Sequence, residues 1–175
     1  SFRFINSAAS WSADGKKIAV AVKHGPRDDI VIIDVAKNRE ERRIRVKLNG
    51  ITTPSWSPDG KQIVFTGYDG GISDLFIVGT DGKNLRRLTN DRYADLHPVF
   101  SPDDALLAFN RAPKGASSVN NPQAEVFVVP TAGGAPRVKD RSDQRTNKAT
   151  SRPTTSTPRH LPRCASRCER GPSSS

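Results

Sequence analysis

Short apolar runs alternate with polar turns along most of this chain. Three of these runs recur at nearly equal spacing, each directly after the same kind of turn: Ile18–Val22, Ile63–Phe65 and Leu106–Phe109. The runs are rich in β-branched and aromatic residues, and no stretch shows sustained helical periodicity. The pattern therefore predicts short strands rather than helices.

The turn before each run repeats a five-residue motif. Its copies are Trp11–Gly15, Trp56–Gly60 and Phe100–Asp104, which begin 45 and then 44 residues apart. Proline presets the backbone of such a turn, aspartate bonds to nearby amides, and glycine accepts a positive φ at its end. The third copy has Asp104 in place of the glycine, and aspartate is one of the few other residues that adopt a left-handed conformation. We expect this third turn to be the most strained.

Each unit contains further candidate strands. A third strand is predicted at Asp29–Ile33, Asp74–Val78 and Glu125–Val129, and a fourth at Arg42–Leu48 and Leu85–Leu88. The third unit is about seven residues longer, and we assign the excess to a loop from Arg111 to Gln123. Four short strands in about 40–45 residues are typical of a propeller blade. The sequence therefore predicts an all-β fold, a partial β-propeller of about three four-stranded blades within residues 1–136.

The positions that recur in the three copies of the motif have structural interpretations. We expect the aromatic residue that opens each copy to pack between neighbouring blades, because buried aromatic rings supply much apolar area; these are Trp11, Trp56 and Phe100. The aspartates of the turns should bond to local backbone amides. They are far apart in sequence, whereas a calcium loop concentrates its oxygens within about a dozen residues. No metal site and no cofactor are predicted.

The residues around the second and third copies are similar to the repeat of TolB-like β-propellers. The resemblance rests on the segments Pro54–Phe65, Gly71–Val78 and Leu88–Asp103, and it covers about residues 7–136 in three copies. It implies a radial propeller, commonly of six blades. It also implies a non-enzymatic, protein-interaction scaffold in the periplasm of bacteria or outside the cell. Similar blades form the non-catalytic propellers of prolyl oligopeptidase-type peptidases, so an accessory propeller of such a peptidase is the alternative interpretation.

No catalytic motif is found in the sequence, neither a Gly-x-Ser-x-Gly elbow nor a phosphate-binding Gly-x4-Gly-Lys loop nor His-Glu-x-x-His. Function is expected in loops held by the rigid scaffold, and two sets of loops should converge on one face. His97 is placed before Pro98 at the start of a strand, as a loop or packing residue rather than a general base. The predicted contact residues are Tyr68, Asp69, Arg92, Tyr93, Asp95 and His97.

The composition changes beyond residue 136. Residues 137–175 contain 10 Lys and Arg against 3 Asp and Glu, a net charge of +7, whereas residues 1–136 contain 18 and 15, a net of +3. This tail is rich in Ser, Thr, Pro and Arg and is predicted to be disordered. It could be a nucleic-acid-binding arm, a linker, or out-of-frame translation, and we favour the last. Its His160, Cys164 and Cys168 are interpreted as incidental rather than zinc ligands.

Length also bears on partners. A six-bladed ring would need roughly 270 residues, so we expect this chain to be part of a longer protein. Open blade edges would favour association with other chains. No run of 18 or more apolar residues is present, so no membrane span is predicted. A protein partner is expected, whereas nucleic acid is not expected beyond the basic tail.

Overall fold

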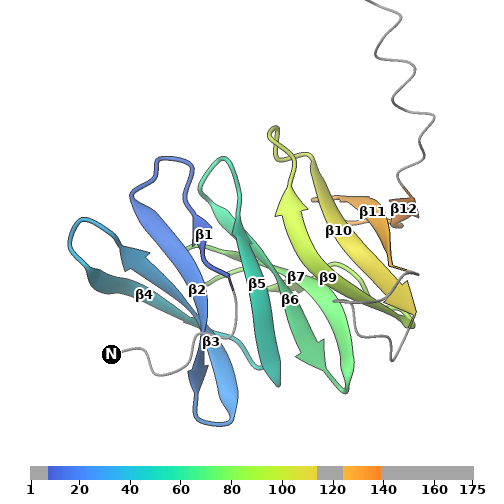
Figure 1. Ribbon diagram of the computed structural model, residues 1–175, viewed down its shortest axis with the longest axis horizontal. Coiled ribbons are helices and arrows are strands. Elements are labelled where there is room, and N and C mark those ends of the chain that lie inside the picture. The colour runs from blue at the N-terminus through green and yellow to red at the C-terminus, as the bar shows by residue number, and fades with distance from the viewer. Residues whose placement is uncertain (1–7, 114–123, 139–175) are drawn as a thin grey trace, which may run out of the picture. The chain divides into compact units, whose positions relative to one another are not determined.

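The computed structural model describes residues 8–113 and 124–138, which form three antiparallel sheets of four strands each. Blade 1 contains β1 (Ser10–Trp11), β2 (Lys17–His24), β3 (Arg27–Asp34) and β4 (Arg39–Arg45). Blade 2 contains β5 (Gly50–Trp56), β6 (Gln62–Asp69), β7 (Ile72–Gly79) and β8 (Arg86–Arg87). Blade 3 contains β9 (Tyr93–Phe100), β10 (Leu106–Pro113), β11 (Glu125–Pro130) and β12 (Arg137–Val138). The predicted fold of about three four-stranded blades is confirmed (Figure 1).

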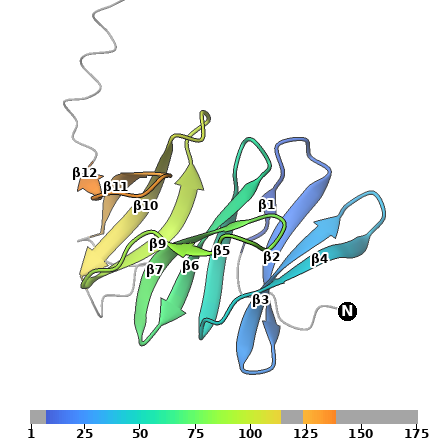
Figure 2. The same ribbon diagram turned by 180° about the vertical axis from the view of Figure 1, so that it is seen from behind.

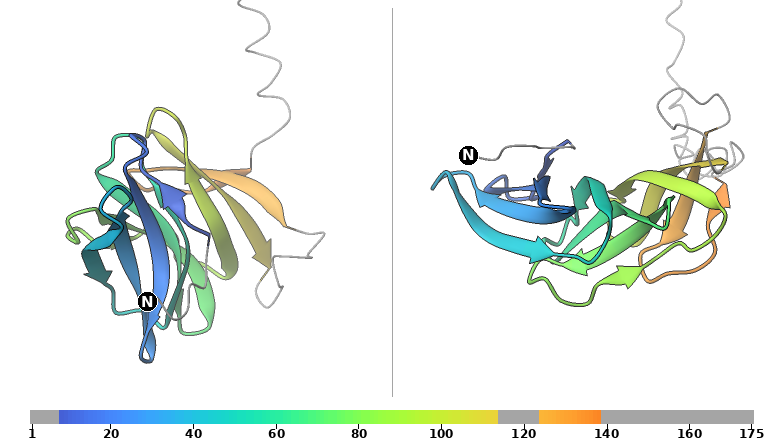
Figure 3. Two further views of the ribbon diagram at one scale, coloured as in Figure 1. Left: turned by 60° about the vertical axis from the view of Figure 1, so that its left-hand side comes forward. Right: turned by 90° about the horizontal axis from the view of Figure 1, so that it is seen from below.

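Within each blade the strands pair in chain order, from the first strand to the fourth. The first strands also contact one another, because β1 lies beside β5 and β5 lies beside β9. Blade 2 lies between blades 1 and 3 in the view from behind as well (Figure 2), and the view from below shows the sheets turned relative to one another (Figure 3, right). The first strands β1, β5 and β9 thus contribute to one inner surface.

Two of the three apolar clusters of the core lie between the blades, and the third is formed by β2 and β3 of blade 1 alone. Alternate residues of a strand face opposite sides of its sheet, and β6 shows this directly. Ile63 and Phe65 pack toward blade 1 in a cluster with Ala19, whereas Val64 packs toward blade 3 in a second cluster with Phe109. Both faces of blade 2 are therefore buried, which explains why its strands read as nearly continuous apolar runs.

The three motif turns lie along one edge of the blades, at the top of Figure 1 in the connections β1–β2, β5–β6 and β9–β10. We call this the Asp-turn edge. In each turn the aspartate accepts the backbone N–H two residues later, at 3.1 Å from Lys16 to Asp14, 2.9 Å from Lys61 to Asp59 and 3.1 Å from Ala105 to Asp103. Each carboxylate also accepts a hydrogen bond from the serine two residues before it. The predicted bonding to local amides is confirmed.

The last position of each motif has the left-handed backbone that its chemistry predicts. The φ angles are 66° at Gly15, 74° at Gly60 and 60° at Asp104. The aspartate in the third copy therefore occupies the conformation for which glycine is usually selected.

The motif turns should make folding sensitive to acid. Hydrogen bonds from the serine hydroxyl and the backbone N–H lower the pKa of Asp14 and Asp103, and those from Lys61 N–H and the Ser57 hydroxyl lower the pKa of Asp59. A lowered pKa in the folded state stabilises the protein above the unfolded pKa near 3.8, and this contribution is lost as pH falls through the folded value.

We therefore expect the triple variant Asp14→Asn, Asp59→Asn, Asp103→Asn to be less stable than wild type at pH 7 but to lose less stability on acidification. Urea unfolding at pH 7 and pH 3 measures this, with the exposed Asp69→Asn as control. Equal losses in the triple variant and wild type would contradict the role of these carboxylates.

The structure corrects one core assignment. Trp56 is 8% exposed and belongs to the cluster between blades 1 and 2, and Phe100 packs against the cluster between blades 2 and 3, as predicted. Trp11 is 58% exposed, so its predicted core role is wrong. The aromatic residue packs against the preceding blade, and the described residues contain no blade before blade 1.

Some predicted boundaries also shift. The strand β4 ends at Arg45, and the apolar Val46 and Leu48 that extended its predicted range lie in the connection to β5, where they are still buried in the core. The third sheet extends to Val138, two residues past the expected end of the repeats. The tail, with His160, Cys164 and Cys168, lies outside the described residues. The described part of the chain contains no helix long and apolar enough to span a membrane.

Candidate protein-interaction surface

The inner strands β5 and β9 carry a bulge at the same repeat position. In β5 the pairing jumps from Thr52 with Thr66 to Ser55 with Val64, and β9 shows the same shift around His97 and Pro98. In each bulge two residues of the inner strand, Thr53–Pro54 in β5 and His97–Pro98 in β9, lie opposite a single residue of the neighbouring strand. Bulges redirect side chains and occur often beside functional sites.

The first residue of each bulge has a positive φ, 48° at Thr53 and 55° at His97. Such values are uncommon outside glycine and unusual for a β-branched residue such as threonine. Backbone strain of this kind is frequently found at binding sites. The structure thus places His97 in the middle of β9, so its predicted position at the start of a strand is wrong.

These bulges line a hollow on the inner surface. It has a volume of about 370 Å³ and is formed by equivalent segments of three blades, Ala8–Trp11, Thr53–Ser55 and His97–Val99. Two of its apolar side chains are largely accessible, with Trp11 58% and Val99 52% exposed, and His97 is exposed as well. Apolar groups grouped in this way on a surface are typical of contact sites for other proteins.

Of the six predicted contact residues, three gather around a residue that the sequence did not single out. Arg111 donates to both carboxylate oxygens of Asp95, at 2.7 and 2.8 Å, and forms an ion pair with Asp91 at 2.7 Å. Its guanidinium also lies over the ring of Tyr93, at 5.1 Å from the centroid. Arg92, the residue before Tyr93, donates to the Tyr93 hydroxyl at 3.2 Å.

This cluster combines burial with charge. Asp95 is fully buried and Arg111 is 8% exposed. Burial disfavours the charged guanidinium, but the hydrogen bonds and charges of Asp95 and Asp91 outweigh this and raise the pKa of Arg111. Arg111 belongs to β10 and not to the loop to which we assigned it, and the remaining loop residues 114–123 lie outside the described residues.

Of the remaining three predicted residues, His97 lines the hollow and the other two lie at a separate turn. Tyr68 and Asp69 end β6 at the edge opposite the Asp-turn edge, and Arg92 and Tyr93 lie at the same edge, where β9 begins. Tyr68 is half-buried beside Gly50, and Asp69 is exposed. The structure therefore brings the predicted loops to one edge, but Tyr68 and Asp69 are not part of the cluster around Arg111.

Sequence reasoning missed Thr53, Trp11 and Val99 as parts of the hollow. A signal was present, because Thr53–Pro54 and His97–Pro98 are both X-Pro pairs 44 residues apart. Within a sheet, proline is confined to edge strands, to the first residue of a strand or to bulges, so a proline that recurs inside a predicted strand indicates a bulge. Among residues 8–113 and 124–138, no group of three or more His, Cys, Asp and Glu side chains could hold a metal ion.

Comparisons with known proteins agree with this architecture. The TolB beta propeller domain family matches residues 1–149. A "Protein TolB homolog" from Chlorobium luteolum is 30% identical over 136 residues, which are 77% of this chain and 29% of that protein. The "Tol-Pal system protein TolB" of Anaeromyxobacter dehalogenans is 32% identical over 100 residues, 56% of this chain and 22% of that protein. The chain thus spans less than a third of the length of these curated relatives.

Solved structures show the same fold. The structure of a putative TolB from Agrobacterium tumefaciens superposes with a TM-score of 0.65 at 24% identity, over 75% of this chain and 48% of that one.

Proposed function

Because this chain belongs to the TolB beta propeller domain family, we propose that it is a non-enzymatic interaction scaffold that binds a protein partner through its inner surface. The observation that carries this proposal is the hollow shared by β1, β5 and β9, with Trp11, His97 and Val99 exposed in it. Large apolar side chains in a hollow are the usual anchors of a protein interface. The equivalent placement of the three segments suits an extended partner segment that crosses all three blades.

The loop residues extend this surface in the proposal. Tyr68, Asp69, Arg92 and Tyr93 supply polar contacts around the hollow, as the rim of an interface commonly does. Asp95 has a different role, because it is buried and both of its oxygens are held by Arg111. It supports the start of β9 and thereby the positions of Arg92 and Tyr93.

We propose a periplasmic or secreted location in a bacterium, which is supported by family membership. The Tol-Pal name of one relative makes the Pal component of the source organism's own Tol-Pal system the first partner to test. The alternative, an accessory propeller of a prolyl oligopeptidase-type peptidase, has less support because the curated relatives reported above carry TolB names.

The proposal can be tested by calorimetric titration of the full chain with purified Pal. We expect Trp11→Ser and Val99→Ser each to weaken binding at least tenfold, since each removes an exposed apolar anchor. The matched control is Val35→Ser, which removes a similarly exposed apolar residue, 41% exposed, from the turn between β3 and β4. Unchanged affinity in both hollow variants, or an equal loss in the control, would contradict binding at the inner surface.

A further inference from the structure

Two gaps separate the motif turns along the Asp-turn edge, and a side chain bridges the second of them. This gap lies between the β5–β6 and β9–β10 turns, and Asp104 spans it. One of its carboxylate oxygens, Oδ2, accepts the backbone N–H of Asp59 at 3.0 Å. Its other oxygen, Oδ1, is buried and has no hydrogen-bond partner in the described part of the chain. A carboxylate therefore fits between two neighbouring motif turns.

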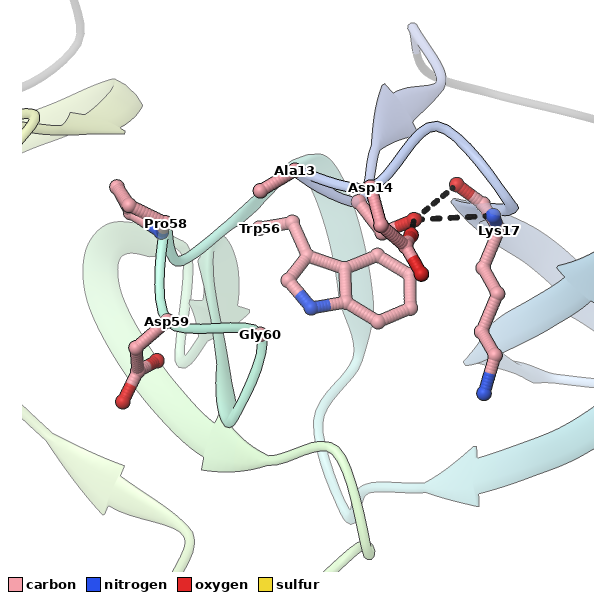
Figure 4. Close-up of a pocket in the computed structure, with 8 residues that line it drawn as sticks. Ala13, Asp14, Lys17, Trp56, Pro58, Asp59 and Gly60 are labelled. Carbon is pink, nitrogen blue, oxygen red and sulfur yellow. Dashed lines mark hydrogen bonds between the residues drawn. The ribbon is translucent and has the colours of Figure 1, made fainter.

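The first gap, between the β1–β2 and β5–β6 turns, has no such side chain. Gly60 occupies the position that corresponds to Asp104, and a Cβ built there would meet nothing within 4 Å. The gap is a cleft of about 250 Å³ whose walls include Ala13, Asp14, Lys17, Trp56 and Pro58. Figure 4 shows the Trp56 indole between the Gly60 turn and Lys17.

Trp56 brings an unused donor to this cleft. It is more than nine-tenths buried, and its indole Nε1 has no acceptor among the described residues. In Figure 4 this nitrogen lies on the Gly60 side of the ring. A buried donor without a partner costs about 1–3 kcal/mol, so such groups are usually satisfied by a ligand or water.

The two gaps are complementary in what they lack. The second has a carboxylate oxygen without a donor, and its aromatic residue, Phe100, has no N–H. The first has an indole donor without an acceptor, and it has glycine, Gly60, at the position where the second has the Asp104 carboxylate. The amide of Asp14 corresponds to the Asp59 amide that Asp104 binds, and no described residue accepts from it.

The charges around the first gap permit an anion. Asp14 and Asp59 flank it, but each carboxylate is held by the serine and the amide of its own turn. The second gap accommodates Asp104 between similar neighbours, Asp59 and Asp103. The first gap has in addition Lys17 in its wall, whose ammonium is paired with Glu41 at 2.7 Å, where the second has Gln62 at the corresponding position.

We propose that the cleft between the β1–β2 and β5–β6 turns is a carboxylate-binding subsite. One carboxylate oxygen accepts from the Asp14 backbone N–H and the other from the Trp56 indole N–H. In the second gap the Asp104 side chain supplies the corresponding carboxylate, which accepts from the Asp59 backbone N–H. The carboxylate comes from an acidic side chain or the C-terminus of a bound polypeptide. This subsite lies on the Asp-turn edge and is independent of the hollow on the inner surface.

Nuclear magnetic resonance of the ¹⁵N-labelled full chain tests this proposal with an internal control. The chain has two tryptophans, of which Trp56 lines the cleft and Trp11 does not. Titration uses three capped peptides: Ac-Gly-Asp-Gly-NH₂, Ac-Gly-Gly-OH, and the neutral Ac-Gly-Asn-Gly-NH₂. We expect a saturable downfield shift of the Trp56 indole and Asp14 amide protons with one or both acidic peptides, which identifies the source of the carboxylate. The Trp11 indole should stay unchanged.

Two variants make the test reciprocal. Gly60→Asp should place a carboxylate in the cleft, so the Trp56 indole proton shifts downfield without peptide and affinity for the acidic peptides falls at least tenfold. Gly60→Asn is its uncharged control and should lower that affinity less. Asp104→Gly opens the second gap, so the Asp59 amide should begin to respond to the acidic peptides.

Three results would overturn the proposal. They are no response of Trp56 in wild type, an equal response to the neutral peptide or to chloride at the same ionic strength, and an unchanged titration in Gly60→Asp. If Gly60→Asp does not fold, the Asp104→Gly variant decides. A shift of the Asp59 amide proton with the acidic peptides supports the proposal, and no shift rejects it.

Discussion

Replacement of Arg111 by methionine is expected to lower the free energy of unfolding by about 3–5 kcal/mol, because it leaves a fully buried carboxylate without its partner. Asp95 is 0% exposed, and both of its oxygens accept hydrogen bonds from Arg111. The variant keeps an apolar side chain but also loses the guanidinium that lies over the rings of Phe109 and Phe127. The expected loss therefore combines the ion pair with these ring contacts, and the double variant with Asp95→Leu separates the two. Urea unfolding followed by circular dichroism measures it.

The design includes a rescue and a matched control. Replacing a buried ion pair by apolar residues is often neutral or stabilising, so Arg111→Met combined with Asp95→Leu should recover most of the loss. Arg92→Met removes a neighbouring but exposed arginine, which should change stability by about 0.5 kcal/mol or less. A double variant as unstable as the single one would show that Arg111 acts through its other contacts.

The two tryptophans that open motif copies should differ greatly in their contribution to stability. Trp56→Ala removes a large side chain from the core between blades 1 and 2 and should cost about 3–5 kcal/mol. Trp11→Ala removes a side chain that is 58% exposed, and surface changes of this kind usually cost about 0.5 kcal/mol or less. Urea unfolding of both variants provides the comparison, each serving as the control for the other. Similar losses would contradict the different burial of the two residues.

This contrast shows what a repeat can and cannot predict. The turn chemistry of the motif is local, so the bonds made by Asp14, Asp59 and Asp103 follow from residues within five positions of each other. Burial of the aromatic residue is not local, since it depends on a neighbouring blade. The similar motifs at Trp11 and Trp56, which differ in Ala13 against Pro58, therefore predict similar turns but not similar burial.

The surface residues were predictable to different degrees. The loops with Tyr68 and Arg92 could be assigned to one edge because antiparallel strands in chain order return each connection to a known side. The Arg111–Asp95 pair joins two strands across a register that only the folded sheet defines. From the sequence, Pro98 after His97 fits either the start of a strand or a bulge, because both positions tolerate proline in a sheet. Thr53–Pro54 lies at the same repeat position, 44 residues earlier, and the structure shows a bulge inside a strand at both pairs.

The placement of the core between blades also determines how cooperatively the molecule can fold. One buried cluster joins blades 1 and 2, and another joins blades 2 and 3. In a linear array of this kind each unit stabilises only its neighbours, and stability is approximately a sum of unit and nearest-neighbour terms. Blade 2 takes part in both terms. It is therefore the unit through which the outer blades are coupled, and loss of its core would uncouple them from each other.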